Sequence, residues 1–145
     1  MPARRTLATG DIDLRATMRS IGTYSRDPTT RWTSNTFTKA VLTPMGPGTM
    51  RLAWDGSGRT TAEAWGSGAD WLLDRAPHWV GLHDDLRGFD PTLNSQVAEW
   101  WRRHPGLRLA AAGVIWQELL LVLLGQRVTV EEALESWVRI VFEWG

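Results

Sequence analysis

The chain contains no cysteine, and this absence excludes disulfide bonds, thiolate zinc sites, iron–sulfur clusters and a cysteine nucleophile. Lys39 is the only lysine, so arginine supplies all the other basic residues. The chain also has no net charge, because its 16 basic and 16 acidic residues cancel. Without a global field that draws the protein onto nucleic acid or anionic lipid, any such binding must be local.

Long hydrophobic runs are absent too. The most apolar stretch, residues 114–124, has about half of the roughly 20 residues that cross a bilayer, and it contains Glu118. It therefore predicts a buried core helix and no membrane association. The basic N-terminus is followed by Asp11 and Asp13 without an apolar segment, so we expect no secretory signal and a cytoplasmic location.

The 145 residues are 43% hydrophobic and include 10 tryptophans, enough to build the core of one domain or of two small lobes. In the first half, apolar and polar residues alternate between clusters of Gly, Pro and Asp, a pattern typical of strands. It predicts strands over residues 12–18, 32–43, 50–54 and 59–65. Residues 55–58, DGSG, predict a hairpin turn between the last two. We expect an antiparallel meander.

From Gly66 onward the apolar spacing becomes helical. It predicts a short helix from Ala69 that stops before Pro77, and a helix ending near His104 whose Val97, Trp100 and Trp101 face the core. The helix predicted over residues 114–124 follows, and then a last helix. Thr129 and Glu132 predict a capping box at the start of that helix. The fold class is therefore α+β, with a strand-rich domain over residues 1–85 and an incomplete helical domain over residues 86–145.

Two other groups of ionisable residues are interpreted as ordinary solvated surface and not as functional sites. His78, His83, Asp84 and Asp85 match no standard metal-ligand spacing, so we assign no metal and interpret them as a solvated loop. Asp70 and Asp74 lie one helical turn apart without a sign of burial, which favours a polar helix face over paired catalytic carboxylates.

Four fragments occur in one order: RDPTTR at residues 26–31, AWGSGA at 64–69, GLRL at 106–109 and GQRVTV at 125–130. Together they resemble the DNA-3-methyladenine glycosylase II family of helix-hairpin-helix DNA glycosylases. The resemblance runs from about residue 11 to residue 145 and corresponds to the front half of the family's length. It implies a sheet like that of the TATA-binding protein followed by a helical domain, a role in base-excision repair of alkylated bases, and no cofactor.

The resemblance also implies what residues 1–145 lack. The family places a catalytic Asp late in its helical domain, beside the sugar that develops positive charge. All nine Asp residues here lie between Asp11 and Asp90, and the Gly-rich hairpin that grips DNA in the family is not found. We therefore expect a truncated protein, or half of a split enzyme, that is inactive as a glycosylase by itself.

For the retained part, the family uses the turn containing its Gly-Gln-x-Val motif to enter the minor groove of DNA. The matching residues are Gln126 and Arg127, so the resemblance implies DNA contact there. Well-known members carry an apolar residue at the position of Arg127. An alternative for Gln126 is that it caps the helix over residues 114–124.

A further alternative is a module without catalysis that binds DNA or another protein. The apolar face of the last helix is expected to be partly uncovered, and it would contact a second chain or a second copy. The residues of this partner face are Val130, Leu134, Trp137, Val138 and Val141.

Overall fold

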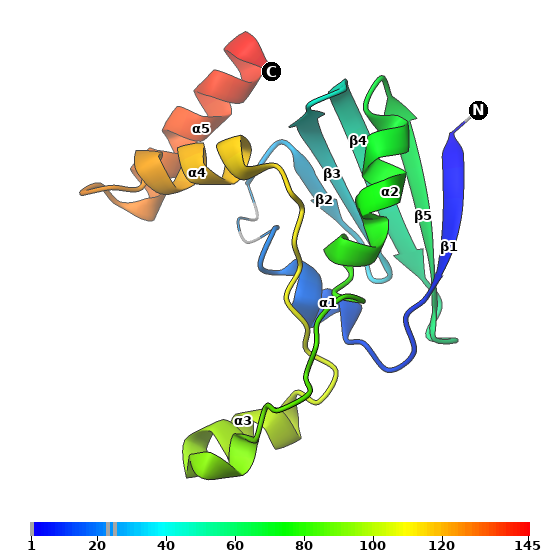
Figure 1. Ribbon diagram of the computed structural model, residues 1–145. Helices are drawn as coiled ribbons and strands as arrows, with labels where there is room; N and C mark the ends of the chain where they lie inside the picture. Colours follow the sequence, from blue (N-terminus) through cyan, green and yellow to red (C-terminus); the bar gives the residue numbers. More distant parts are fainter. Residues whose placement is uncertain (1, 23, 25) are drawn as a thin grey trace.

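The computed structural model describes residues 2–22, 24 and 26–145, and its centre is a five-stranded antiparallel sheet (Figure 1). The order across the sheet is β1-β5-β4-β3-β2. The strands are β1 (Ala3–Ala8), β2 (Thr30–Trp32), β3 (Thr36–Thr43), β4 (Gly46–Trp54) and β5 (Arg59–Gly66). Helices make up most of the remaining chain, so the predicted α+β class with the sheet before the helices is confirmed.

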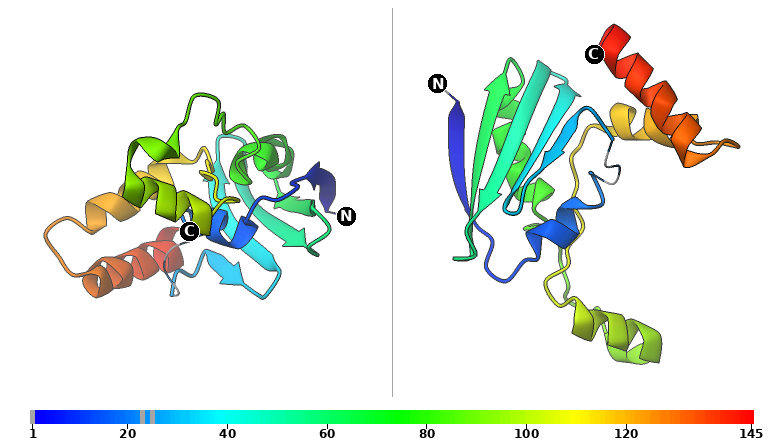
Figure 2. Two further views of the ribbon diagram at one scale, coloured as in Figure 1. Left: turned by 90° about the horizontal axis from the view of Figure 1, so that it is seen from below. Right: turned by 180° about the vertical axis from the view of Figure 1, so that it is seen from behind.

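The helices are α1 (Leu14–Met18), α2 (Ala69–Trp79), the short 3-10 helix η1 (Pro91–Leu93), α3 (Ser95–Arg103), α4 (Ile115–Leu124) and α5 (Val130–Trp144). Helix α2 covers one face of the sheet, whereas no helix of the described residues lies across the opposite face (Figure 2, right). Helices α4 and α5 form a hairpin beside the sheet, and α3 stands away from it (Figure 1). Among the described residues, no helix is both long and apolar enough to cross a membrane.

The core lies between the sheet and α2. Strand alternation turns one side of β3 and β4 inward, and Phe37, Met50 and Leu52 are completely buried against Leu72 and Trp79 of α2. The indole N–H of Trp79 donates to the carbonyl of Ala112 at 3.2 Å, so residues that follow α3 also close this core.

The predicted strand over residues 12–18 is wrong, because these residues form α1. Asp13 caps the helix by accepting a hydrogen bond from the amide of Ala16 at 2.9 Å. Leu14, Thr17 and Met18 are buried with helical spacing, a set that the alternating pattern did not distinguish from a strand face. Strand β1 was not predicted.

The predicted strand over residues 32–43 is divided into β2 and β3 by a tight turn. The amide of Thr33 donates to the carbonyl of Thr36 at 3.0 Å, and the two hydroxyls lie 2.7 Å apart. The predicted turn at residues 55–58 is confirmed: the amide of Ser57 donates to Asp55 Oδ1 at 2.9 Å between β4 and β5.

Helix α2 does not stop before Pro77, as predicted, but continues to Trp79. Proline has no N–H for the carbonyl four residues earlier, which is that of Leu73. Here Arg5 of β1 supplies the missing donor, with its Nη1 at 3.2 Å from that carbonyl oxygen. A side chain from the edge strand therefore lets the helix pass through a proline.

Helices α3 and α4 exist where predicted, but they are not core helices. No residue of either helix is fully buried, and Trp100 is 55% exposed. Trp101 packs against Phe89, with ring centroids 5.3 Å apart, instead of reaching the sheet. Apolar character was taken as burial, and that inference is wrong for both helices.

Residues 106–114 carry the chain from α3 back to the sheet. The carbonyl of Gly106 accepts from the amide of Asp13 at 2.8 Å, and the amide of Arg108 donates to Thr17 Oγ1 at 3.1 Å. Gly81 meets this segment with φ of +72°, and a Cβ there would lie 2.3 Å from that of Arg108. The chain therefore leaves the compact part formed by the sheet, α1 and α2 at residue 81, and it returns to that part beside the same point.

Candidate functional site

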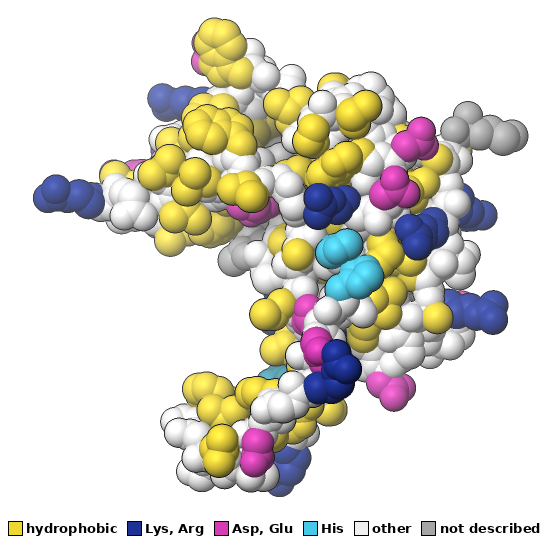
Figure 3. Space-filling view, in the orientation of Figure 1, with side chains coloured by type: hydrophobic (Ala, Val, Ile, Leu, Met, Phe, Trp, Pro, Cys, Tyr) yellow, Lys and Arg dark blue, Asp and Glu magenta, His cyan; other side chains and the backbone are white. Residues whose placement is uncertain are grey.

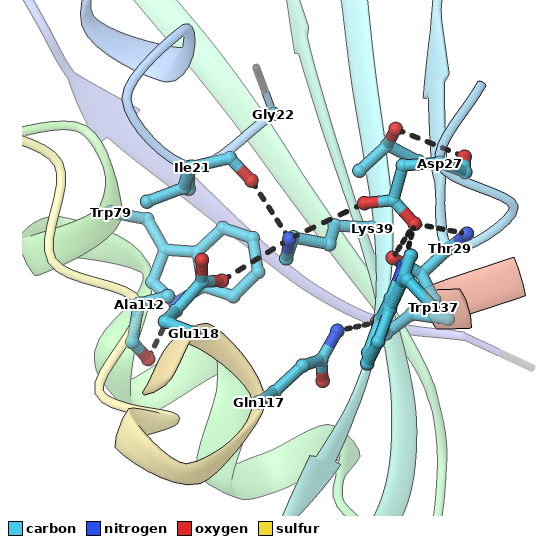
Figure 4. Close-up of polar contacts among 12 residues, drawn as sticks. Ile21, Gly22, Asp27, Thr29, Lys39, Trp79, Ala112, Gln117, Glu118 and Trp137 are labelled. Atoms are coloured by element: carbon cyan, nitrogen blue, oxygen red, sulfur yellow. Dashed lines mark hydrogen bonds and ion pairs between the residues drawn. The ribbon is translucent and has the colours of Figure 1, made fainter. Parts of the chain in front are cut away.

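A buried amine joins the sheet to the α4–α5 hairpin. The side chain of Lys39, in β3, is only 3% exposed, and its Nζ donates to the carbonyl of Ile21 at 2.8 Å (Figure 4). Glu118 Oε1 of α4 lies 3.2 Å from the same Nζ, in the geometry of an ion pair and not of a hydrogen bond. Asp27 Oδ2 lies 4.0 Å from it. Two carboxylates from different parts of the chain thus share one ammonium group.

Asp27 extends this cluster to α5. Its Oδ1 accepts the indole N–H of Trp137 at 2.8 Å, as well as the amide of Thr29 at 2.9 Å and the hydroxyl of Thr29 at 2.7 Å (Figure 4). Asp27 and Trp137 are both 5% exposed. Buried charges persist when they are paired and hydrogen-bonded, and this carboxylate meets both conditions.

A third contact lies beside the first two. Gln117 Nε2 of α4 donates to the carbonyl of Ala40, in β3, at 3.3 Å. We call Asp27, Lys39, Gln117, Glu118 and Trp137 the polar junction. It sets the position of the α4–α5 hairpin, because α4 has no fully buried residue and α5 has only Ala133 and Trp137.

The turn between α4 and α5 carries the two residues predicted to contact DNA. Gln126 Nε2 donates to the carbonyl of Val122 at 3.1 Å, so the side chain caps α4, as the alternative proposed. Arg127 is exposed and has φ of +62°, the only non-glycine residue with positive φ among those described. An arginine held in the left-handed region is unusual and marks the tip of the hairpin.

The start of α5 fixes the other side of this turn. The predicted capping box is confirmed: the amide of Glu132 donates to Thr129 Oγ1 at 3.3 Å, and the amide of Thr129 donates to Glu132 Oε2 at 2.8 Å. The backbone amide and hydroxyl of Thr129 hold the pKa of the Glu132 carboxyl below its ordinary value. The turn therefore lies between two capped helix ends.

An apolar groove of about 520 Å³ lies between α4, α5 and the sheet. We call it the aromatic groove, because it is lined by Trp65 of β5, Trp116 of α4 and Trp137 and Trp144 of α5. Hydrophobic side chains also gather on the outer side of the hairpin (Figure 3). In the predicted partner face, Val130 is 61% exposed, Trp137 is buried, and the other three are half-buried: Leu134, Val138 and Val141.

His78 lies in α2 and not in a solvated loop, and its ring stacks on that of His83, with ring centroids 4.2 Å apart. Burial lowers the pKa of His78, and the nearby charges of His83 and Arg75 act in the same direction. Asp84 Oδ2 accepts the amide of Leu109 at 2.6 Å and so ties down the chain returning from α3. Within the described ranges, no group of three or more His, Asp or Glu side chains is placed to hold a metal ion.

Sequence reasoning missed the polar junction. It assigned Trp137 to the partner face and gave no role to Lys39 or Asp27. One signal was available: a single lysine in an arginine-rich chain stands between Phe37 and Val41, at an inward position of a strand. The partners come from residues up to 110 positions apart, which no local pattern reveals.

Comparison with known proteins supports the fold. No protein-family model and no curated protein matches the sequence. Among solved structures, the chain is similar to a 3-methyladenine DNA glycosylase from Archaeoglobus fulgidus, with a TM-score of 0.69 and 12% sequence identity. The match covers 99% of this chain and 50% of the glycosylase, so the chain spans half the length of that structure. At this identity the likeness shows the fold, an antiparallel sheet followed by helices.

Proposed function

We propose that the protein belongs to base-excision repair of alkylated DNA and corresponds to the front part of a glycosylase. The observation that carries the proposal is structural similarity over 99% of the chain to a 3-methyladenine DNA glycosylase. The four sequence fragments that resemble the glycosylase II family agree with this proposal. One of these fragments contains Asp27 of the polar junction, and another contains the α4–α5 turn.

The proposed DNA contact is the α4–α5 turn. Arg127 stands at its exposed tip, and its guanidinium can enter a minor groove or pair with phosphate. Gln126 is engaged with the carbonyl of Val122, so Arg127 is the principal contact and Gln126 supports the turn.

Replacing Arg127 with Ala is expected to weaken binding to a DNA duplex that contains an abasic-site analogue by about tenfold, because one charge-assisted contact is lost. The slope of log affinity against log salt should become shallower by about 1. Fluorescence anisotropy at several salt concentrations measures both quantities.

The matched control is Arg59→Ala, which removes an exposed arginine at the start of β5. It should leave affinity within about twofold, because it removes the same charge away from the turn. Equal losses in the two variants would show general charge attraction and contradict a role for the turn. A chain that binds no duplex at low salt, but self-associates in sedimentation velocity, would favour the protein-interaction alternative through the partner face.

We further propose that residues 1–145 alone do not cleave the glycosidic bond. When the base departs, positive charge develops on the sugar. The family stabilises that charge with an Asp carboxylate late in its helical domain. The last Asp of this sequence is Asp90, before α3 begins. The purified chain is expected to release no 3-methyladenine from methylated DNA above the rate without protein. Chromatography of the released bases measures this, with an intact glycosylase as positive control. Release above background that rises with chain concentration would refute the proposal.

A further inference from the structure

The uncovered face of the sheet carries a row of charged side chains at one level. Arg31 of β2 lies opposite Thr38 of β3, which lies opposite Arg51 of β4. The row continues through Glu63 of β5 to Arg4 of β1. Because neighbouring strands are about 4.8 Å apart, Arg31 and Arg51 stand about 10 Å apart across Thr38. Thr38 and Arg51 alternate with buried neighbours along β3 and β4, and Arg31 is paired with Thr38, so this part of the row faces away from the core.

Glu63 pairs with two of the three arginines in this row, Arg4 and Arg51. Arg4 Nη2 lies 2.7 Å from Glu63 Oε1, while Arg51 Nε lies 3.5 Å from Glu63 Oε2. Arg31 has no carboxylate within ion-pair distance among the described residues. The side of the row toward β2 therefore retains positive charge.

A hollow of about 560 Å³ lies at this positive end. Of its ten lining residues, six are threonines and two are Arg31 and Arg51. None of the described Asp or Glu residues lines it. Guanidinium groups and hydroxyls are the side chains that most often hold phosphate oxygens in complexes with nucleic acids.

The hollow runs directly into the aromatic groove. The two share Thr29, Ala40 and Thr49 in their linings, so they form one continuous surface. Exposed indole rings stand at its other end, with Trp116 67% exposed and Trp144 78% exposed. In the part of the chain that the structure describes, no Asp or Glu side chain lines the groove either. Cationic groups beside aromatic rings are the chemistry of single-stranded nucleic acid binding, in which rings stack on bases and cations hold the backbone.

We propose that this continuous surface binds single-stranded DNA, with phosphates at Arg31 and Arg51 and bases stacked along Trp65 and Trp116. The exposed rings favour this ligand over an acidic peptide, because carboxylates would use the arginines and leave the indoles uncovered. The inference does not depend on Arg127, and it adds a second DNA-binding surface to the one proposed above.

The test is anisotropy of a fluorescent thymidine oligonucleotide of about 10 nucleotides, within the span that one such surface covers. The double variant Arg31→Gln/Arg51→Gln should bind at least about tenfold more weakly. Its salt slope should become shallower by about 1.4, since each single-strand phosphate contact contributes about 0.7. Trp65→Leu should also weaken binding by about tenfold through loss of stacking.

The matched control is Arg59→Gln, because Arg59 lines neither the hollow nor the aromatic groove. It should change affinity by less than about twofold. Thermal melting verifies that each variant is folded. The proposal would be overturned if Arg59→Gln weakened binding equally or if the oligonucleotide did not bind saturably. It would also be overturned if polyglutamate or millimolar inorganic phosphate displaced the oligonucleotide.

Discussion

Replacing Lys39 with Met should lower the free energy of unfolding by about 3 kcal/mol or more, because it leaves a buried carboxylate without its counter-charge. The Lys39 and Asp27 side chains are 3% and 4% exposed, so water cannot take over the lost interaction without a rearrangement. Glu118 is better placed to adapt, since its side chain is 36% exposed. Urea denaturation followed by tryptophan fluorescence measures the change.

The double variant Asp27→Asn/Lys39→Met provides the control for this explanation. Asparagine keeps an oxygen that can accept the indole N–H of Trp137, but it carries no charge that needs compensation. The double variant should therefore be more stable than Lys39→Met alone. The charge argument is wrong if Lys39→Met lowers the free energy of unfolding by less than about 1 kcal/mol. It is also wrong if adding Asp27→Asn lowers the free energy of unfolding by as much as Asp27→Asn does alone.

Trp137→Ala is expected to lower the free energy of unfolding by about 3–5 kcal/mol, the range for truncation of a large buried aromatic side chain. The loss should be concentrated in α5, because Trp137 is one of only two buried residues of that helix. Trp137→Phe keeps most of the apolar contact and removes the hydrogen bond to Asp27, at an expected cost of about 1.5–3 kcal/mol. Equilibrium unfolding gives the energies, and hydrogen exchange locates the loss.

Trp144→Ala is the matched comparison, because it removes the same side chain from the same helix at a position that is 78% exposed. Its effect on stability should stay within about 0.5 kcal/mol. Similar costs for the two tryptophans would mean that α5 is not held by the polar junction.

The elements that were predicted correctly depend on contacts between residues close in sequence. The capping box of Thr129 and Glu132 and the turn at Asp55 and Ser57 each span two or three positions. The strand predicted over residues 12–18 failed for a related reason. Alternation fitted Leu14 and Met18, yet the cap at Asp13 favours a helix in which those residues share a face.

Burial could not be predicted in the same way. The strongly apolar α4 lies largely exposed, because burial depends on which segments reach a helix and not on its own composition. The polar junction shows the same limitation, since Lys39 is recognisable as unusual while its partners are brought to it only by the fold. The division near residue 85 and the roles of Gln126, Arg127 and the partner face stay predictions.

The close approach of Gly81 and Arg108 has a consequence for how the chain tolerates change. Residues 82–107 leave and rejoin the compact part of the chain at neighbouring points, so α3 and its two connections form an excursion from it. Lengthening such an excursion costs only loop-closure entropy, about 0.6 kcal/mol for each doubling of its length. We therefore expect insertions within residues 82–107 to leave the sheet intact.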